Sequence, residues 1–186
     1  KNIDIIKFKT LITYLMISSI TYSPITVKRI NGEIRQFNKM IKELDENSKY
    51  IYIHPNPDNI LEIYFLIKGN KSSNFKNGEY ICKLVHHTQY PLKAPDYYVL
   101  TPNGRFEVNR KICLTNSAYH QGEWAPAAWN LLTLLNGFYS IWHSEIKEDK
   151  LGIGHINTSP DTIKNLATKT INFNKTTLSE YNKFFH

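Results

Sequence analysis

The chain has 186 residues, of which 41% are hydrophobic and 13% aromatic, so it can bury a core and is not disordered. Its two cysteines exclude a disulfide framework, and no histidine stands at zinc-site spacing from either. The formal net charge of +7 permits acidic partners, but the bases are scattered without a compact block, which argues against nucleic-acid binding. We therefore expect one domain with at most an appendage, working in a reducing compartment, without a metal.

The N-terminal part divides into an arm and a helix. Residues 1–22 are interpreted as an arm, either an extra strand or helix docked on the body or a weakly ordered tail. Its apolar stretch is too short and too polar to span a membrane. Ser23-Pro24 then begins a helix, because proline is favoured in the first turn. Its apolar residues recur at helical spacing on one face, and its bases lie mostly off that face, among them Lys28, Arg29 and Arg35. The bases form either a solvated face or a docking surface.

Four strands are predicted at 50–53, 61–68, 79–85 and 97–100. The turns between them are short, which implies an antiparallel meander. The second strand alternates and should bury one face. Cys82, in the third, is interpreted as structural, and His86 and His87 at its end as surface residues.

The C-terminal part is predicted to be helical. Residues 129–142 are apolar nearly all round, which is typical of a helix buried in the core. Another helix should begin at Ser159-Pro160 and end at Asn174, and a last one should cover 178–185. The fold class is therefore α+β: an N-terminal helix, a four-stranded antiparallel meander, a long loop, a central buried helix and C-terminal helices.

The long loop at 101–129 carries the residues best suited to chemistry. Cys113 has polar neighbours, which favours a nucleophilic thiol over a core residue. Asn103 follows a proline, where it would either bond to its own backbone or donate to a developing oxyanion. His120, seven residues after the cysteine, is a candidate base, an orienting group or a plain surface histidine.

Several motifs together resemble the ubiquitin-conjugating enzymes, in particular the branch that is usually tail-anchored in the endoplasmic reticulum. They are DNILE at 58–62, GEY at 78–80, YPLKAP at 90–95, TPNGRF at 101–106, ICL at 112–114 and EWAPAAW at 123–129. TPNGRF with a cysteine ten residues after its asparagine is the feature of that branch. His-Pro-Asn at 54–56 is not the family motif, because it precedes Cys113 by a whole sheet. The resemblance covers residues 23–186 as a conjugating core domain and leaves the arm outside.

The resemblance implies a thioester mechanism. Cys113 would accept ubiquitin from the activating enzyme, and a lysine or hydroxyl of a protein substrate would then attack the same carbonyl. Asn103 would brace the loop or bind the oxyanion, and His120 would assist. Family members usually carry an acid two residues after the cysteine, where this chain has Thr115, so hydroxyl acceptors become plausible.

The resemblance also implies the partners. A ligase, of the RING type, would bind Leu92, Ala125, Pro126 and Ala127, and the activating enzyme would bind the first helix through Lys28, Arg29 and Arg35. The chain would need no cofactor, since the activating enzyme uses the ATP. We expect a monomer in the cytoplasm, or on the cytosolic face of the endoplasmic reticulum if a tail anchor has been removed. No anchor-like apolar run follows the domain.

Two other functions remain open: an inactive ubiquitin-binding scaffold of the same fold, and a papain-like cysteine hydrolase that uses Cys113, His120 and Asn103. The scaffold is disfavoured because such variants usually lose the cysteine. The hydrolase is disfavoured because Cys113 and His120 are too close in sequence.

Overall fold

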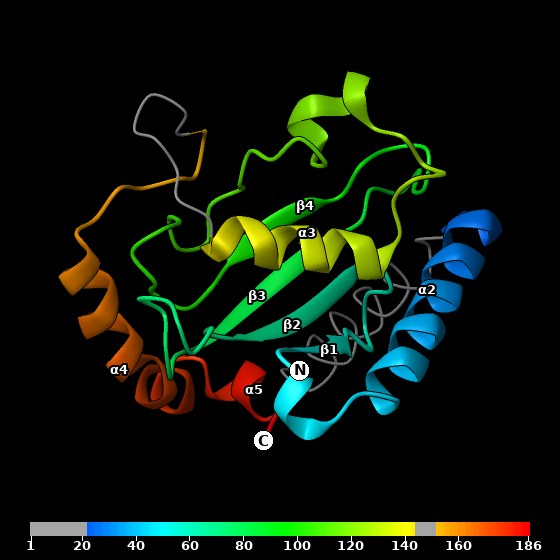
Figure 1. The fold of residues 1–186 in the computed structure, drawn as a ribbon. Coiled ribbons are helices and arrows are strands. Elements are labelled where there is room, and N and C mark those ends of the chain that lie inside the picture. Colours follow the sequence, from blue (N-terminus) through cyan, green and yellow to red (C-terminus); the bar gives the residue numbers. More distant parts are fainter. Residues whose placement is uncertain (1–21, 144–151) are drawn as a thin grey trace, which may run out of the picture.

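The computed structural model describes residues 22–143 and 152–186, so all of the predicted arm except Tyr22 lies outside it. The fold is the predicted α+β arrangement, in which a four-stranded antiparallel sheet has the order β1-β2-β3-β4. Figure 1 shows α3 crossing one face of this sheet, with α2 and α4 on opposite sides of the molecule.

The strands are β1 (Ile51–Pro55), β2 (Glu62–Lys68), β3 (Glu79–Val85) and β4 (Asp96–Val99). They pair in chain order, with Phe65 opposite Cys82 and Cys82 opposite Val99. The short connections therefore produce the meander that the sequence predicts. Cys82 is fully buried in β3, between β2 and β4, and burial raises the pKa of its thiol well above the ordinary value.

Helix α2 (Pro24–Lys42) begins at the proline that follows Ser23, as predicted. Its last turn carries the basic residues Lys39 and Lys42, and Glu43 is its C-cap. Its buried positions include Ile30 and Phe37, which carry the apolar face onto the core. A short 3-10 helix, η1 (Glu46–Ser48), leads from α2 into β1.

Helix α3 (Leu131–His143) buries one face rather than its whole circumference. That face carries Leu131, Leu134, Leu135, Phe138 and Trp142, each with no exposed surface. The Phe138 ring lies 5.7 Å edge-on from Phe65 of β2 and 5.2 Å from the Tyr97 ring of β4, measured between ring centroids. The prediction of a central helix is confirmed. On its other side Ser140 is exposed and Tyr139 is half-buried.

Helix α4 (Pro160–Thr176) begins as predicted, with the Ser159 side chain accepting a hydrogen bond from the Thr162 N–H at 3.2 Å. The prediction that Asn174 ends it is wrong. Asn174 lies inside α4 and is fully buried, where its Nδ2 donates to the Glu79 carbonyl at 2.9 Å. The tertiary hydrogen bond outweighs the low helix propensity of asparagine.

The last helix is shorter than predicted: α5 (Ser179–Asn182). Phe184, just after it, stacks on His54 with ring centroids 4.0 Å apart, and Tyr181 lies 4.9 Å from Tyr64. Side chains alternate along β2, so Tyr64 points away from the α3 side that Phe65 faces. The C-terminal segment therefore covers the other face of the sheet, and β2 buries both faces instead of the predicted one.

Candidate active site and partner-facing loops

The loop after β4 opens with a turn that Asn103 organises. Its Oδ1 accepts the backbone N–H groups of Arg105 at 2.8 Å and Phe106 at 2.7 Å. Its Nδ2 donates to the carbonyls of Thr101 at 3.0 Å and Phe106 at 3.1 Å. Both amide hydrogens are thus engaged within the turn, and only 1% of Asn103 is exposed. The side chain has the geometry of a loop brace.

The same turn is fastened to the C-terminal half of the chain. The Thr101 hydroxyl accepts the Ile81 N–H at 2.9 Å and donates to Asn174 Oδ1 of α4 at 2.7 Å. Gly104 has a positive φ of 83°, and a Cβ there would lie 2.7 Å from the Thr158 hydroxyl oxygen. Only glycine combines this conformation with so close an approach.

Cys113 is the half-buried cysteine of the two, and its backbone is held by a segment near residue 153. Its N–H donates to the Ile153 carbonyl at 2.8 Å, and its own carbonyl accepts from His155 Nε2 at 3.2 Å. Gly154, with a φ of 81°, lets this segment approach, since a Cβ there would meet the Lys111 carbonyl oxygen at 2.7 Å. We call residues 152–156 the strap.

Sequence reasoning missed the strap, because nothing in its own pattern ties it to a cysteine about forty residues earlier. The only local hint is a pair of glycines, Gly152 and Gly154, in a run that reads as a plain loop. Burial lowers the pKa of His155, although its hydrogen bond to the Cys113 carbonyl opposes that shift. A neutral His155 donates from Nε2, because a carbonyl can only accept.

The Cys113 thiol faces His120. Sγ lies 3.2 Å from His120 Nε2, and His120 Nδ1 lies 3.8 Å from a carboxylate oxygen of Glu123, which is largely exposed. His120 belongs to the 3-10 segment η2 (Ala118–Glu123), where its φ of −118° and ψ of 49° break the helical geometry. The structure thus brings two of the three predicted catalytic residues into contact, a histidine that could take a proton and a thiol that could lose one.

Lys111, the base nearest Cys113 in sequence, is occupied elsewhere. Its ammonium group forms an ion pair with Asp96 at 2.8 Å and lies 4.9 Å from the centre of the Tyr119 ring. Partial burial acts to lower the pKa of Lys111, but the hydrogen bond and charge of Asp96 outweigh it and raise the pKa. Thr115, two residues after Cys113, is exposed.

Neither a metal site nor a membrane span is found in 22–143 and 152–186. No group of three or more His, Cys, Asp or Glu side chains there could hold a metal ion. No helix within the same ranges is long and apolar enough to cross a bilayer.

Comparison with known proteins identifies the family. The sequence matches none of the models that describe protein families, so the identification rests on individual related proteins. The chain is 35% identical over 141 residues to "Ubiquitin-conjugating enzyme E2 J2-like" of Dictyostelium discoideum, an alignment that covers 76% of this chain and 78% of that protein. The chain belongs to the ubiquitin-conjugating enzymes.

Two further relatives match the branch that the TPNGRF motif indicates. "Ubiquitin-conjugating enzyme E2 6" of Saccharomyces cerevisiae is 38% identical over 141 residues, and "Ubiquitin-conjugating enzyme E2 J2" of Homo sapiens is 36% identical over 125 residues. These alignments cover 75% and 67% of this chain. They span only 54% of the yeast protein and 46% of the human one.

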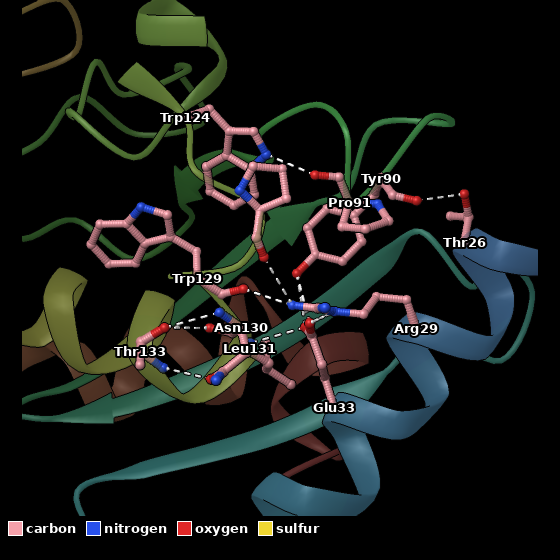
Figure 2. A network of polar contacts seen from close by, with 11 residues as sticks. Thr26, Arg29, Glu33, Tyr90, Pro91, Trp124, Trp129, Asn130, Leu131 and Thr133 are labelled. Atoms are coloured by element: carbon pink, nitrogen blue, oxygen red, sulfur yellow. Dashed lines mark hydrogen bonds and ion pairs between the residues drawn. The ribbon is translucent and has the colours of Figure 1, made fainter. Parts of the chain in front are cut away.

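In this member of the ubiquitin-conjugating family, the residues predicted to face a ligase lie on two adjacent loops. Leu92, with 72% of its surface exposed, lies in one, while Ala125 and Ala127 are exposed and Pro126 half-buried in the other. The loops are joined by the Trp124 indole N–H, which donates to the Pro91 carbonyl at 2.7 Å (Figure 2), and by Gln121 Nε2, which donates to the Leu92 carbonyl at 3.2 Å.

The three bases predicted to meet the activating enzyme differ in their surroundings. Lys28 and Arg35 of α2 are exposed and available to a partner. Arg29 is half-buried and donates to the backbone carbonyls of Pro126 at 3.3 Å and Trp129 at 2.8 Å. Its guanidinium therefore holds the second loop, a task that the sequence pattern does not reveal.

Proposed function

We propose that this ubiquitin-conjugating enzyme homologue carries ubiquitin as a thioester on Cys113. The supporting observation is the half-buried Cys113 thiol, 3.2 Å from His120 Nε2, on a loop that Asn103 and the strap hold in place. Cys82 is fully buried in β3, and its raised pKa disfavours the thiolate that a nucleophile needs.

The chemistry has two transfers. In the first, the Cys113 thiolate attacks the thioester carbonyl of ubiquitin on the activating enzyme, and that enzyme's thiolate leaves. In the second, an acceptor amine or hydroxyl attacks the new thioester, the tetrahedral oxyanion collapses and the Cys113 thiolate leaves. The acceptor loses one proton in this step, and His120 Nε2, 3.2 Å from Sγ, is placed to accept it.

Asn103 acts in this proposal as a brace, with an oxyanion contact as the alternative. Each amide hydrogen already serves a backbone carbonyl, so a donation to the oxyanion would require one of those bonds to break. No cofactor takes part, because ATP is consumed by the activating enzyme.

The position of His120 supports a hydroxyl acceptor at least as well as lysine. An imidazole nitrogen at this place can accept a proton from a serine or threonine hydroxyl held against the carbonyl. The exposed Thr115 supplies no carboxylate that would assist a lysine ammonium group.

The proposal includes partners and a location that the family membership supports. Ubiquitin, the activating enzyme, a RING-type ligase and a protein substrate would bind a monomer, with Leu92 and 125–127 facing the ligase and Lys28 and Arg35 facing the activating enzyme. The resemblance to the tail-anchored branch supports action on the cytosolic face of the endoplasmic reticulum.

Charging of cysteine variants tests the proposal. With activating enzyme, ATP and ubiquitin, the parent protein should gain one ubiquitin that thiol reagents remove. Cys113→Ser should form a thiol-resistant ester or no adduct, and Cys82→Ser is the matched control that should charge normally. Charging of Cys113→Ala through Cys82 would refute the assignment of the site, and a parent protein that does not charge would refute the proposal and favour the scaffold function.

A further inference from the structure

A buried carboxylate lies where α2, the 90–95 loop and the start of α3 meet (Figure 2). Glu33 is only 6% exposed. The Tyr90 hydroxyl donates toward both of its oxygens, at 3.0 and 2.9 Å, and the Leu131 N–H donates to Oε2 at 2.9 Å. Glu33 also forms an ion pair with Arg29, one turn earlier in α2. A carboxylate this deeply buried needs such partners, because desolvation of an unpaired charge is costly.

The partners of Glu33 reach both ligase-facing loops. Tyr90 begins the loop that presents Leu92, and Arg29 donates to the carbonyls of Pro126 and Trp129 in the other loop. Figure 2 shows the guanidinium between Glu33 and that second loop. One carboxylate on α2 therefore connects to both loops through single side chains.

A second residue of α2 strengthens the connection. The Thr26 hydroxyl, fully within the core, lies 2.6 Å from the Tyr90 carbonyl and 3.1 Å from that of Thr88. The exposed side chains of Leu92, Ala125 and Ala127 take no part in these polar contacts. Their relative position depends on the backbone that the network holds.

The chemistry of the network suits positioning better than stabilisation. A buried ion pair often contributes little net stability compared with apolar residues of the same volume. Its hydrogen bonds are directional, however, whereas apolar packing tolerates rotation and sliding. A network with fixed directions sets the spacing between two loops.

We propose that Glu33 is a positioning residue that holds the two ligase-facing loops in register through Tyr90 and Arg29. A RING-type ligase that contacts Leu92 and 125–127 together would find its surface preformed, and α2 and the ligase surface would behave as one unit. The proposal rests on the proposed function for the identity of the partner, but the geometry of the loops can be tested without ubiquitin.

Three variants separate the contacts. Glu33→Gln keeps the size and removes the charge, Tyr90→Phe removes the hydroxyl, and Arg29→Met removes the donors to Pro126 and Trp129. Lys39→Met is the matched control, since it removes an exposed charge from the same helix. Should Glu33→Gln fail to fold, Tyr90→Phe and Arg29→Met each break one arm of the network.

Amide hydrogen exchange of the uncharged protein is the first measurement. We expect Glu33→Gln to speed exchange in both 90–95 and 123–131, Tyr90→Phe to speed it in 90–95, and Arg29→Met to speed it in 123–131, by about tenfold or more, since local opening becomes easier. Exchange at 101–116 and in β3 should match the parent. The proposal would be overturned if exchange were faster throughout the chain, or if exchange in the two loops were no faster than in the parent. Either result is independent of whether Cys113 is ever charged.

Single-turnover discharge is the second measurement. The probe is a purified RING domain selected because it stimulates discharge of the parent thioester. The network variants should need about five- to tenfold more RING domain for half-maximal stimulation, because the loops must then become ordered on binding and this costs conformational entropy. The maximal rate and the unstimulated rate should stay within about twofold of the parent, a split that simple destabilisation would not produce. Equal RING requirement in all variants, or a lowered maximal rate alone, would overturn the proposal.

Discussion

Asn103 and Glu33 are two buried polar side chains that organise loops, one loop for Asn103 and two for Glu33, and they differ in where their partners lie. Every hydrogen bond of Asn103 that braces the Cys113 loop goes to a residue within three positions of it. Glu33 reaches Tyr90, 57 positions away, and Leu131, 98 positions away. The bonds of Asn103 are therefore local to its turn, whereas those of Glu33 join segments that only the folded core brings together.

This difference determines what each loop depends on. The Asn103 turn uses uncharged groups that are close in the chain, so little loop-closure entropy opposes it. The Glu33 network requires α2, the 90–95 loop and α3 to be in place first. Helix α3 supports both regions, since Leu131 at its start bonds to Glu33 and its Phe138 packs on Phe106 beside the Asn103 turn, with ring centroids 5.5 Å apart.

The largest expected effect comes from disrupting that shared support. Leu135 is fully buried on α3, and Leu135→Asp places an unpaired carboxylate in the core. Such burial costs several kcal/mol against a total stability of about 5–15 kcal/mol, so the domain should unfold. Ser140→Asp, on the exposed side of the same helix, should remain folded. Thermal unfolding followed by circular dichroism measures the effect. A cooperative transition of Leu135→Asp near the melting temperature of the parent would contradict the position of α3.

The next effect separates the two roles of Asn103. Asn103→Ala removes the acceptor of two backbone N–H groups and should lower the free energy of unfolding by about 3–4 kcal/mol. Asn103→Asp keeps an acceptor for those groups and should lose less than half as much.

Single-turnover discharge of the same two variants tests the chemistry. If Asn103 is a brace, the rates should follow stability, with Asp closer to the parent than Ala. If its N–H groups instead stabilise the oxyanion, both variants should be slowed about equally, by about a hundredfold or more.

The local regularities of the chain made most of the fold predictable. The alternation and turn residues gave β3 its observed bounds, and Ser159-Pro160 marked the start of α4. The errors lie where distant residues decide. Asn174 reads as a helix breaker, yet its amide is satisfied by Glu79 and Thr101 inside the core.

The residues of the candidate site also fall into those that the sequence predicts and those that it does not. Cys113, His120 and the Asn103 turn are close in sequence and could be found there. The strap at 152–156, the buried Glu33 and the carbonyl contacts of Arg29 could not, because glutamate and arginine on a helix usually indicate a solvated face. Their function depends on backbone groups brought near by folding, which no residue spacing encodes.

A smaller effect is expected from His120, which contacts the Cys113 thiol without belonging to either network. His120→Ala should slow discharge to serine, threonine or glycerol by about a hundredfold, as for loss of a general base, and discharge to free lysine much less. Glu123→Gln, at a largely exposed position, should change either rate only severalfold. Preformed thioester, mixed with each acceptor at several pH values, provides the measurement. Strong lysine reactivity with no hydroxyl product would contradict the acceptor preference.

The smallest expected effect is a loss of folding stability at acidic pH, through a histidine that packs against Tyr90 of the Glu33 network. His86, predicted at the surface, is only 2% exposed and packs edge-on against the Tyr90 ring, with centroids 4.4 Å apart. Its Nδ1 donates to the Leu61 carbonyl at 3.1 Å, and its buried Nε2 has no hydrogen-bond partner among the described residues. Burial lowers the pKa of His86 from 6.5 to about 4, although the bond to Leu61 opposes the shift.

The unfolded chain therefore binds the His86 proton more readily than the folded protein does. The stability from a neutral His86 is fully present above pH 6.5 and is lost as the pH falls from 6.5 toward 4, by about 2 kcal/mol between pH 7 and pH 5. Burial also lowers the pKa of His143 to about 4, so His143 adds a loss of the same sign. Urea unfolding at pH 7, 6 and 5 should show this loss, and His86→Phe, which keeps a ring against Tyr90, should remove the His86 share of it. An unchanged pH dependence in His86→Phe would mean that His86 is protonated in the folded protein without cost, and hence that the region beside Tyr90 admits water.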